Sequence, residues 1–273
     1  NDNGQVQLER LPQAIKPNTK MVFLQRSRGY SWRNPVTIDQ IAEVVNTVKQ
    51  INSQIIVFVD NCYGELVETR EPGDVNADLL AGSLIKTLGG SLAPTGGYIA
   101  GRSHLVELAA QRLTAPGIGG EVGPTWGWQR LFFQGLFFSP LTVIESLKGA
   151  IFAAAFWKAM GFKVHPEPDS PRTDLIQAVE LGSRERMIAF AQGLHQGSPI
   201  DSHVIPIPDA MPGYEDEVIM AGGTFIQGAT SEFSADGPLR PPYIVYQQGG
   251  ISYQYVKLAN ILAAFSLWKN GLL

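Results

Sequence analysis

The feature that most constrains the fold is a continuous apolar run at residues 55–59 (IIVFV), which ends abruptly at Asp60. The run is rich in β-branched residues and does not alternate with polar ones, a pattern typical of a strand buried on both faces of a sheet. A shorter strand is predicted at residues 21–24, and a helix is predicted to begin near Thr37, between the two strands. This order predicts a right-handed βαβ unit, so the fold class is α/β. The helix presents one apolar face, made of Ile38, Ile41, Val44, Val45 and Val48.

The rest of the chain divides into two parts. Strands predicted at residues 78–82 and 98–101 bring the first part to about four strands of a mostly parallel sheet. A long helix is predicted from about Pro140 to Met160, after which the pattern becomes that of a smaller α+β layer. We therefore place a domain boundary inside this helix, with residues 1–145 in the larger domain and 146–273 in the smaller one. The smaller domain is predicted to hold strands at 162–165, 175–179, 218–221 and 224–229 and helices at 184–194 and 253–268.

Composition argues against several classes of function. Acidic residues (25) outnumber Lys and Arg (21), so no excess of basic charge is present to neutralise phosphates, and we expect no nucleic-acid partner. The single cysteine, Cys62, can form neither an internal disulfide nor a cysteine-based zinc site, which suits a reducing cytoplasm. The longest uninterrupted apolar run, residues 150–157, is far short of the ~20 residues that cross a bilayer, so no membrane partner is expected. No metal site is predicted, because metal-ligand spacing is absent from the histidines, His104, His165, His195 and His203.

Asp60 and Lys86 are the residues best placed to carry chemistry. Asp60 ends the buried strand, and Lys86 follows the strand predicted at residues 78–82. Ligands of open α/β sheets bind beyond the carboxyl ends of the strands. One interpretation of the pair is a structural ion pair. The other is a pyridoxal phosphate site, in which a lysine amine bonds the aldehyde and a carboxylate keeps the ring nitrogen protonated. Spacing alone leaves both interpretations open.

The residues around this pair resemble a known family. Residues 59–63 (VDNCY) and 82–90 (GSLIKTLGG) are similar to fold-type I pyridoxal phosphate enzymes, above all to the carbon–sulfur lyases of the Cys/Met metabolism group. The run from 59 to 102, with APTGGYIAG at 93–101, resembles the methionine γ-lyase-like family, which is also labelled aluminium resistance protein. Residues 25–30 (QRSRGY) and 247–250 (QQGG) fit it too, so the resemblance spans essentially the whole chain. It implies an aminotransferase-like large domain followed by a smaller α+β domain.

The resemblance assigns a role to individual residues. Lys86 would hold the internal aldimine of pyridoxal 5'-phosphate, and Asp60 would face the pyridine nitrogen. Ser83 resembles the serine that binds the cofactor phosphate, and Tyr63 resembles the tyrosine that bonds its phenolic oxygen. The carbon–sulfur lyases usually have a threonine just before the lysine. Ile85 stands there in this chain, so one expected phosphate contact is missing.

Several other residues have a functional and a structural interpretation. Arg240 lies where fold-type I enzymes commonly place the arginine that binds a substrate carboxylate, with a solvated loop arginine as the equal alternative. Arg26, Arg28 and Arg33 leave one strand end together and either bind an anion or lie at the surface. Cys62 is expected to pack as a small apolar residue near the cofactor rather than to act as a nucleophile.

The activity implied by the resemblance is β- or γ-elimination from a sulfur-containing amino acid. The lysine, kept neutral by its surroundings, would remove the α-proton of this small-molecule substrate. An aminotransferase remains an alternative, because it uses the same lysine and aspartate. A third possibility is a non-catalytic protein of this fold linked to metal tolerance. The resemblance also implies a homodimer or tetramer, since related enzymes build each active site from two subunits.

The resemblance further implies segments that we do not find. Fold-type I enzymes have a seven-stranded, mostly parallel large-domain sheet. They take a phosphate-binding glycine loop and a ring that stacks on the cofactor from sequence well before the aspartate strand. Here a polar lead-in, one strand and one helix precede Asp60. We therefore expect this chain to be the carboxyl-terminal portion of a longer polypeptide, lacking roughly 100–150 residues.

Overall fold

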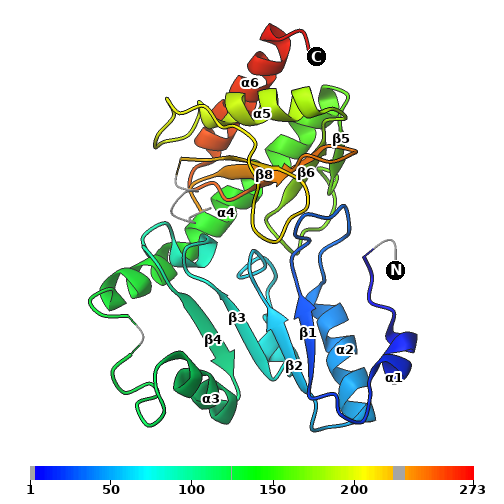
Figure 1. Cartoon of the computed structure of the whole chain (residues 1–273), viewed down its shortest axis with the longest axis vertical. Helices are drawn as coiled ribbons and strands as arrows, with labels where there is room; N and C mark the ends of the chain where they lie inside the picture. The colour runs from blue at the N-terminus through cyan, green and yellow to red at the C-terminus, as the bar shows by residue number, and fades with distance from the viewer. Residues whose placement is uncertain (1–3, 124, 224–230) are drawn as a thin grey trace.

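The computed structural model describes residues 4–123, 125–223 and 231–273 and contains two sheets (Figure 1). The first sheet is four-stranded, in the order β1-β2-β3-β4, with β1, β2 and β3 parallel and β4 antiparallel to β3. The predicted α/β class is therefore confirmed. The elements of this half are η1 (Leu8–Arg10), α1 (Leu11–Ala14), β1 (Met21–Gln25), α2 (Ile38–Ile51), β2 (Ile56–Asp60), η2 (Pro72–Val75), β3 (Leu79–Ser83), η3 (Thr87–Gly89), β4 (Gly97–Gly101) and α3 (Ser103–Leu113).

Helix α2 forms where the sequence predicts it and covers one face of the first sheet. The Thr37 side chain accepts the N–H of Gln40, and the Gln40 side chain accepts the N–H of Thr37, which closes a capping box. All five residues of its predicted apolar face are buried, against Val57 and Val59 of β2 among others. This packing fixes β2, and with it the direction in which Asp60 leaves the sheet.

The opposite face of the first sheet is apolar and largely open to solvent. Met21 is 44%, Phe23 56% and Ile99 43% exposed. The Phe23 ring lies 5.3 Å from the Phe58 ring, centroid to centroid. Because side chains alternate along a strand, Asp60 projects from the same face as Phe58. Strands β1 and β4 form the outer edges of the sheet, so neither has a second strand partner among the described residues. Within the described part of the chain, the sheet therefore has two free edges and one uncovered face.

The long helix α4 (Gln129–Ala159) begins well before the predicted start near Pro140, which lies inside it. A proline often occupies the first turn of a helix, so the sequence favoured that position. The helix extends further because its first half packs against η3, with the backbone of Gly135 against Gly89 and Gly90. Its second half places Ala153, Ala154 and Trp157 in the core of the carboxyl-terminal half.

Helix α4 is also long and apolar enough to cross a membrane by length and composition, with a mean hydropathy of 1.4 over its most apolar window. The run at residues 150–157 did not reveal this, since single polar residues interrupt the apolar stretch. A core helix passes the same test, and 39% of that window is buried inside the fold.

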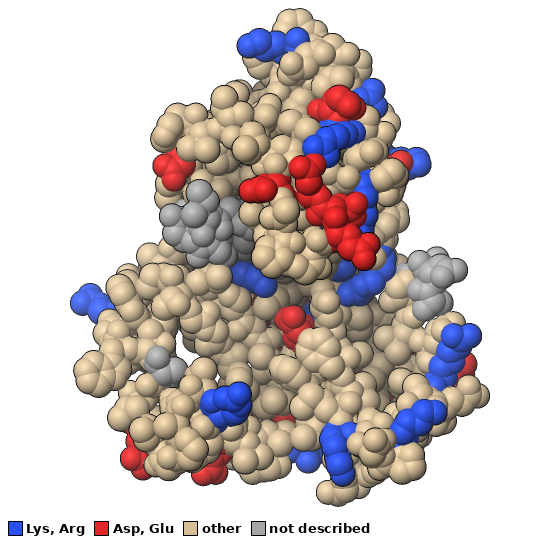
Figure 2. Space-filling view, viewed as in Figure 1, with Lys and Arg blue, Asp and Glu red and all other residues tan. Residues whose placement is uncertain are grey.

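Exposed apolar side chains on α4 include Phe133 (73%) and Phe137 (78%). On the face seen in Figure 2, acidic side chains gather over the second half, and much of the first half is uncharged.

The second half is an α+β layer. Its sheet is five-stranded and antiparallel, in the order β5-β6-β9-β8-β7. Helices α4, α5 and α6 supply its core with Trp157, Phe190 and Leu267, all fully buried. The elements are β5 (Lys163–His165), β6 (Gln177–Glu180), α5 (Arg184–His195), β7 (Val218–Ala221), β8 (Ser234–Pro238), β9 (Ile244–Gln248) and α6 (Tyr253–Lys269).

Sequence patterns missed two strands of this sheet. The strand predicted at residues 224–229 lies outside the described residues. Strands β8 and β9 escaped prediction because polar side chains such as Asp236, Gln247 and Gln248 are buried in them and break the apolar pattern. The domain boundary at residue 145 lies inside α4, which packs on both halves, and it stays a prediction.

The contact between Gly135 and the turn after Lys86 gives a test of the fold. A methyl group at position 135 would overlap the carbonyl oxygen of Gly89. We expect Gly135→Ala to lower the free energy of unfolding by about 1–3 kcal/mol, as overpacking does. Gly120→Ala is the matched control, because its methyl group meets no described atom within 4 Å. Urea unfolding should show a change within about 0.5 kcal/mol for the control. Equal effects of the two variants would contradict this account of the contact.

Candidate active site

The parallel pairing of β2 with β3 brings Asp60 and the Lys86 segment to one edge of the first sheet. Asp60 pairs in register with Ala81, and β3 ends at Ser83. Lys86 precedes η3 directly. The Asp60 Oδ1 accepts the backbone N–H of Cys62 at 3.0 Å, which holds the carboxylate at the end of its strand. The arrangement expected from the sequence, with both groups beyond the carboxyl ends of neighbouring strands, is therefore present.

The Lys86 side chain interacts with the last residue of β2 and with two of the residues that follow it. Its Nζ lies 4.6 Å from the centroid of the Tyr63 ring, and the Cys62 thiol is its hydrogen-bond partner. Burial by itself would lower the pKa of the Lys86 ammonium. Tyr63, Cys62 and Asp60 together outweigh burial, and the pKa is raised. In the ligand-free chain these contacts favour the ammonium form of Lys86. The expectation that its surroundings keep the lysine neutral during the reaction stays a prediction.

Cys62 lies within this group but is a poor nucleophile. Burial raises the pKa of its thiol to about 11, against the opposing charge of Lys86. A thiol with that pKa is almost entirely protonated at pH 7, and the thiolate is the reactive form.

Tyr63 links the two halves of the chain at the site. Its backbone carbonyl accepts the N–H of Leu175 at 3.1 Å, and its side chain packs with Ile176, Ala178 and Tyr246 of the second half. The Tyr63 ring beside Lys86 is thus held in place by contacts with the second half. A second link joins Tyr30, after β1, to the buried carboxyl group of Asp236 in β8.

The donor set at this edge fits pyridoxal phosphate. It offers an amine (Lys86), a carboxylate (Asp60) and an aromatic ring (Tyr63), together with a hydroxyl (Ser83) that has no hydrogen-bond partner among the described residues. Such a set can bond an aldehyde, accept a ring N–H and contact a phosphate. The hydroxyl of Thr87, directly after Lys86, is buried and has no partner in the described part of the chain.

Of the arginines considered in the sequence, Arg26 and Arg28 are fully buried rather than at the surface. Arg26 pairs with Glu68 at 2.8 Å and with Glu71 at 3.2 Å. The Arg28 Nε lies 3.6 Å from Asp174 Oδ2, and its Nη1 donates to the His165 carbonyl at 3.0 Å. Both therefore act within the protein.

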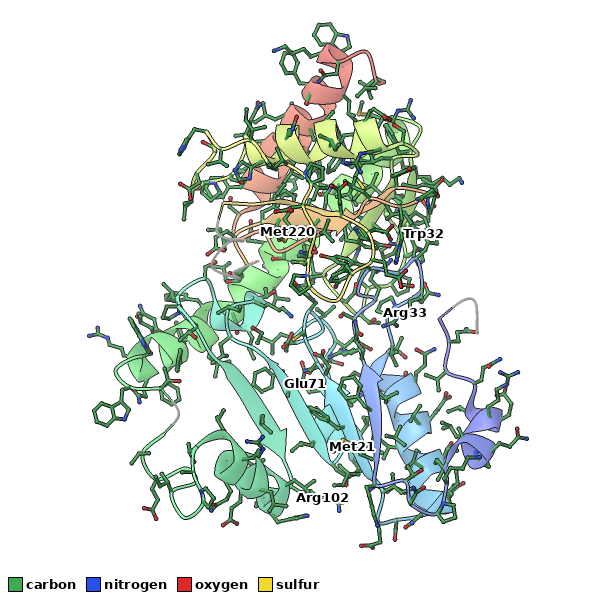
Figure 3. All side chains as sticks on the ribbon, in the orientation of Figure 1. Met21, Trp32, Arg33, Glu71, Arg102 and Met220 are labelled. Carbon is green, nitrogen blue, oxygen red and sulfur yellow. The ribbon has the colours of Figure 1, made fainter. Side chains whose placement is uncertain are left out.

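Arg33 and Arg240 are more open. Arg33 donates to the backbone carbonyl oxygens of Ser27 and Asn34 and lies between the two sheets (Figure 3). Arg240 is half exposed, with its Nη1 3.6 Å from Asp216 Oδ2. Its role in binding a substrate carboxylate stays a prediction.

Sequence reasoning missed a buried polar chain beneath the site. The Tyr98 hydroxyl donates to Glu65 Oε1 at 3.1 Å, and the Asn61 Nδ2 donates to the Tyr98 oxygen at 3.3 Å and to Glu71 Oε2 at 2.9 Å. Glu65 is 4% exposed, and burial raises the pKa of its carboxyl group to about 7. In Figure 3, Glu71 lies at the site end of the sheet, and Met21 and Arg102 mark the opposite end.

One feature of the sequence could have pointed to this chain. Any side chain at position 82 would collide with Glu65 and Tyr98, so β3 carries glycine there. A glycine inside a strand indicates that other groups approach the backbone closely.

Comparisons with known proteins agree with the sequence resemblance. The family described as Methionine gamma-lyase matches residues 1–267. The chain is 51% identical over 271 residues to the uncharacterized protein YnbB of Bacillus subtilis, covering 99% of this chain and 64% of that one. It is 46% identical to a carbon-sulfur lyase involved in aluminum resistance from Clostridium novyi, with a TM-score of 0.89, covering 97% of this chain and 62% of that one. The chain therefore spans less than two thirds of the length of these relatives.

A more distant structure supports the fold alone. The cystathionine gamma synthase of Xanthomonas oryzae is 15% identical, with a TM-score of 0.57, over 91% of this chain and 64% of that one. At this level of identity the likeness shows that the two share an α/β architecture.

The raised pKa of Glu65 predicts how stability depends on pH. Its folded-state pKa of about 7 lies above the ordinary 4.5, so the folded state binds more protons between these values and stability falls as pH rises through them. Glu65→Gln removes this dependence. We expect it to gain about 3 kcal/mol relative to the wild type between pH 5 and pH 8, measured by urea unfolding. Glu43→Gln, at an exposed position, is the control and should show no such gain. A difference between Glu65→Gln and the wild type that is independent of pH would contradict the assignment.

Proposed function

The chain belongs to the methionine γ-lyase family, and from this premise we propose that it acts in pyridoxal phosphate-dependent carbon–sulfur bond cleavage on a sulfur-containing amino acid. The observation that carries the proposal is the gathering of Lys86, Tyr63 and Asp60 at the carboxyl edge of parallel strands. The relative from Clostridium novyi, described as a carbon-sulfur lyase, supports sulfur as the leaving atom.

The cofactor would be held by groups from two strand ends and one turn. The Lys86 amine would bond its aldehyde carbon, and the Ser83 hydroxyl would donate to its phosphate. The Asp60 Oδ1 is already engaged by the Cys62 N–H, so Oδ2 is the oxygen left to accept the ring N–H. When bound, the cofactor supplies an electron sink that stabilises negative charge on the substrate α-carbon.

The protein's own contribution centres on the proton at Lys86 Nζ. The ammonium must release a proton before Nζ can bond an aldehyde or accept the substrate α-proton. The Tyr63 ring and the Cys62 thiol shield Nζ from water and orient it. Because the pKa of Lys86 is raised, loss of this proton is unfavourable near neutral pH in the ligand-free chain.

The uncovered face of the first sheet is relevant to which polypeptide segments form the complete cofactor site. Asp60 projects from the face that leaves Met21, Phe23 and Ile99 exposed, and the chain spans 64% of the length of the Bacillus subtilis relative. We propose that further polypeptide, in the same chain or in a partner, covers this face and completes the cofactor site. The residues described here would then bind the cofactor weakly by themselves.

Covalent labelling tests the cofactor site directly. Incubation with excess pyridoxal phosphate followed by borohydride reduction should fix the cofactor mass on the peptide that contains Lys86. Lys86→Ala should lose that label, whereas Lys148→Ala, which removes a lysine exposed on α4, should retain it. Peptide mass spectrometry reads the result. A label confined to other lysines would overturn the assignment of Lys86.

The reaction itself is tested by product analysis on the cofactor-loaded protein. With cysteine, cystathionine and methionine as substrates, we expect release of a keto acid together with a thiol, and loss of most of this activity in Asp60→Asn. A neutral amide cannot hold the proton of the ring nitrogen as a carboxylate does. A keto acid that forms without thiol and only with an amino acceptor would identify an aminotransferase. Absence of both products would contradict a catalytic function.

A further inference from the structure

The loop after β1 is tied to the second half through Asp236, a buried acid that the proposed chemistry does not use. The Tyr30 hydroxyl, from this loop, is hydrogen-bonded to Asp236 Oδ2 in β8. The other carboxyl oxygen, Oδ1, accepts an N–H of the Gln248 side chain in β9 at 2.5 Å. Figure 1 shows the loop rising from the end of β1 toward the second sheet. Asp236 therefore joins segment 25–30 of the first half to segment 247–250 of the second.

Asp236 is buried without a compensating cation among the described residues. It is 3% exposed, and the ionisable groups that face it are the hydroxyls of Tyr30 and Tyr246. The neighbouring strand β7 places an uncharged methionine opposite it. Arg28 and Arg240, which interact with Tyr246, are each paired with another aspartate. Burial therefore raises the pKa of the Asp236 carboxyl group from 3.8 to about 7, against the hydrogen bond from the glutamine amide.

The hydrogen-bond partners decide which oxygen of Asp236 can carry a proton. The Gln248 Nε2 can only donate, so Oδ1 must stay an acceptor. A tyrosine hydroxyl can donate or accept, so Oδ2 can face Tyr30 either as a carboxylate oxygen or as a protonated O–H. Both forms keep the two hydrogen bonds, but only the carboxylate buries a charge without a counter-ion. Opening of the contact to water therefore relieves the ionised form and gives no such relief to the protonated one.

We propose that the contact between Tyr30 and Asp236 is a proton-controlled latch between the two halves, closed by the carboxylic acid and loosened by the carboxylate. The switch moves one proton between solvent and Asp236 Oδ2, and no other bond is made or broken covalently. Tyr30 packs in the same apolar cluster as Tyr63, whose ring lies beside Lys86. The latch therefore also holds part of the cluster against which the Tyr63 ring packs. It lies beyond the proposed function and needs neither cofactor nor turnover.

Amide hydrogen exchange of the ligand-free chain tests the latch. The Arg28 N–H donates to Asp174 Oδ2 across the halves at 3.1 Å, so its protection measures how rarely the loop leaves the second half. Protection is followed from pH 4.5 to 8.5, after correction for the intrinsic exchange rate. The closed form of Asp236 binds more protons than an exposed carboxyl group between pH 3.8 and about 7, so protection should fall as pH rises through this window. The fall should approach about tenfold per pH unit and level off above pH 7.

Three variants separate the proton from the packing. Asp236→Asn mimics the protonated acid, because its amide oxygen can accept Gln248 and its NH2 group can donate to the Tyr30 oxygen. It should keep the Arg28 amide protected and remove most of the fall with pH. Asp169→Asn, at an exposed position of the same half, is the matched control and should keep the wild-type profile. Tyr30→Phe removes the hydroxyl and should lower protection at pH 5 by about twofold to tenfold, the value of one hydrogen bond.

Protection of the Arg28 amide that stays constant or rises between pH 4.5 and pH 7 in the wild type would overturn the latch. An unchanged fall in Asp236→Asn, or unaltered protection in Tyr30→Phe, would do the same. These outcomes are independent of the labelling of Lys86 by pyridoxal phosphate. If labelling fails and the fall depends on Asp236, the proposed function falls and the latch stands. If labelling succeeds without this pH dependence, the function stands and the latch falls.

Discussion

The site depends on the register between β2 and β3. Because Asp60 pairs with Ala81 in a parallel ladder, both strands deliver their following residues to the same edge of the sheet. A shift of one residue would turn Asp60 toward α2 and Val59 toward the open face. The register is held by the burial of Val57 and Val59 under α2, so the placement of the carboxylate follows from apolar packing on the other side of the strand.

The same strand ends carry much of the buried charge of the first half. Arg26, at the end of β1, is held by Glu68, Glu71 and Asn61, all from the segment after β2. Arg28 connects the two halves in the same way, because it pairs with Asp174 and donates a hydrogen bond to the His165 carbonyl. Removal of one partner from a buried ion pair leaves an uncompensated charge, so loss of either arginine or of its acidic partner would destabilise the loops around the site. The described contacts give Arg26 and Arg28 an architectural role, and the anion-binding role considered for them stays a prediction.

The features that depend on local sequence patterns and on strand direction were predicted from the sequence. The run at residues 55–59, the cap at Thr37 and the apolar face of α2 appear in the structure with small shifts of their ends. Strands β8 and β9 could not be predicted, because Asp236 and Gln248 are buried through a hydrogen bond to each other across neighbouring strands. The start of α4 was missed because its cause, the contact of Gly135 with Gly90, joins distant segments.

Among the site residues, the positions of Asp60 and Lys86 followed from strand order, whereas their electrostatic setting did not. The charge of Lys86 depends on Tyr63 and Cys62, whose side chains face it only because the chain turns sharply after β2, with Tyr63 at a positive φ of 67°. The partner of Glu65 is a tyrosine on a strand that lies beyond β3. Such pairings have no periodic signature, and only the folded backbone reveals them.

The meeting of Gly89 and Gly90 with Gly135 also limits how this sequence can diverge. The turn after Lys86 and the first half of α4 approach so closely that a side chain on either would push the other away. A substitution at one of these positions is tolerated only if the helix moves, and the helix is held at its other end by Trp157 in the second core. Changes in the two segments must therefore be accepted together. The evolution of the turn after Lys86 is thus tied to that of helix α4, whose far end lies in the other half of the chain.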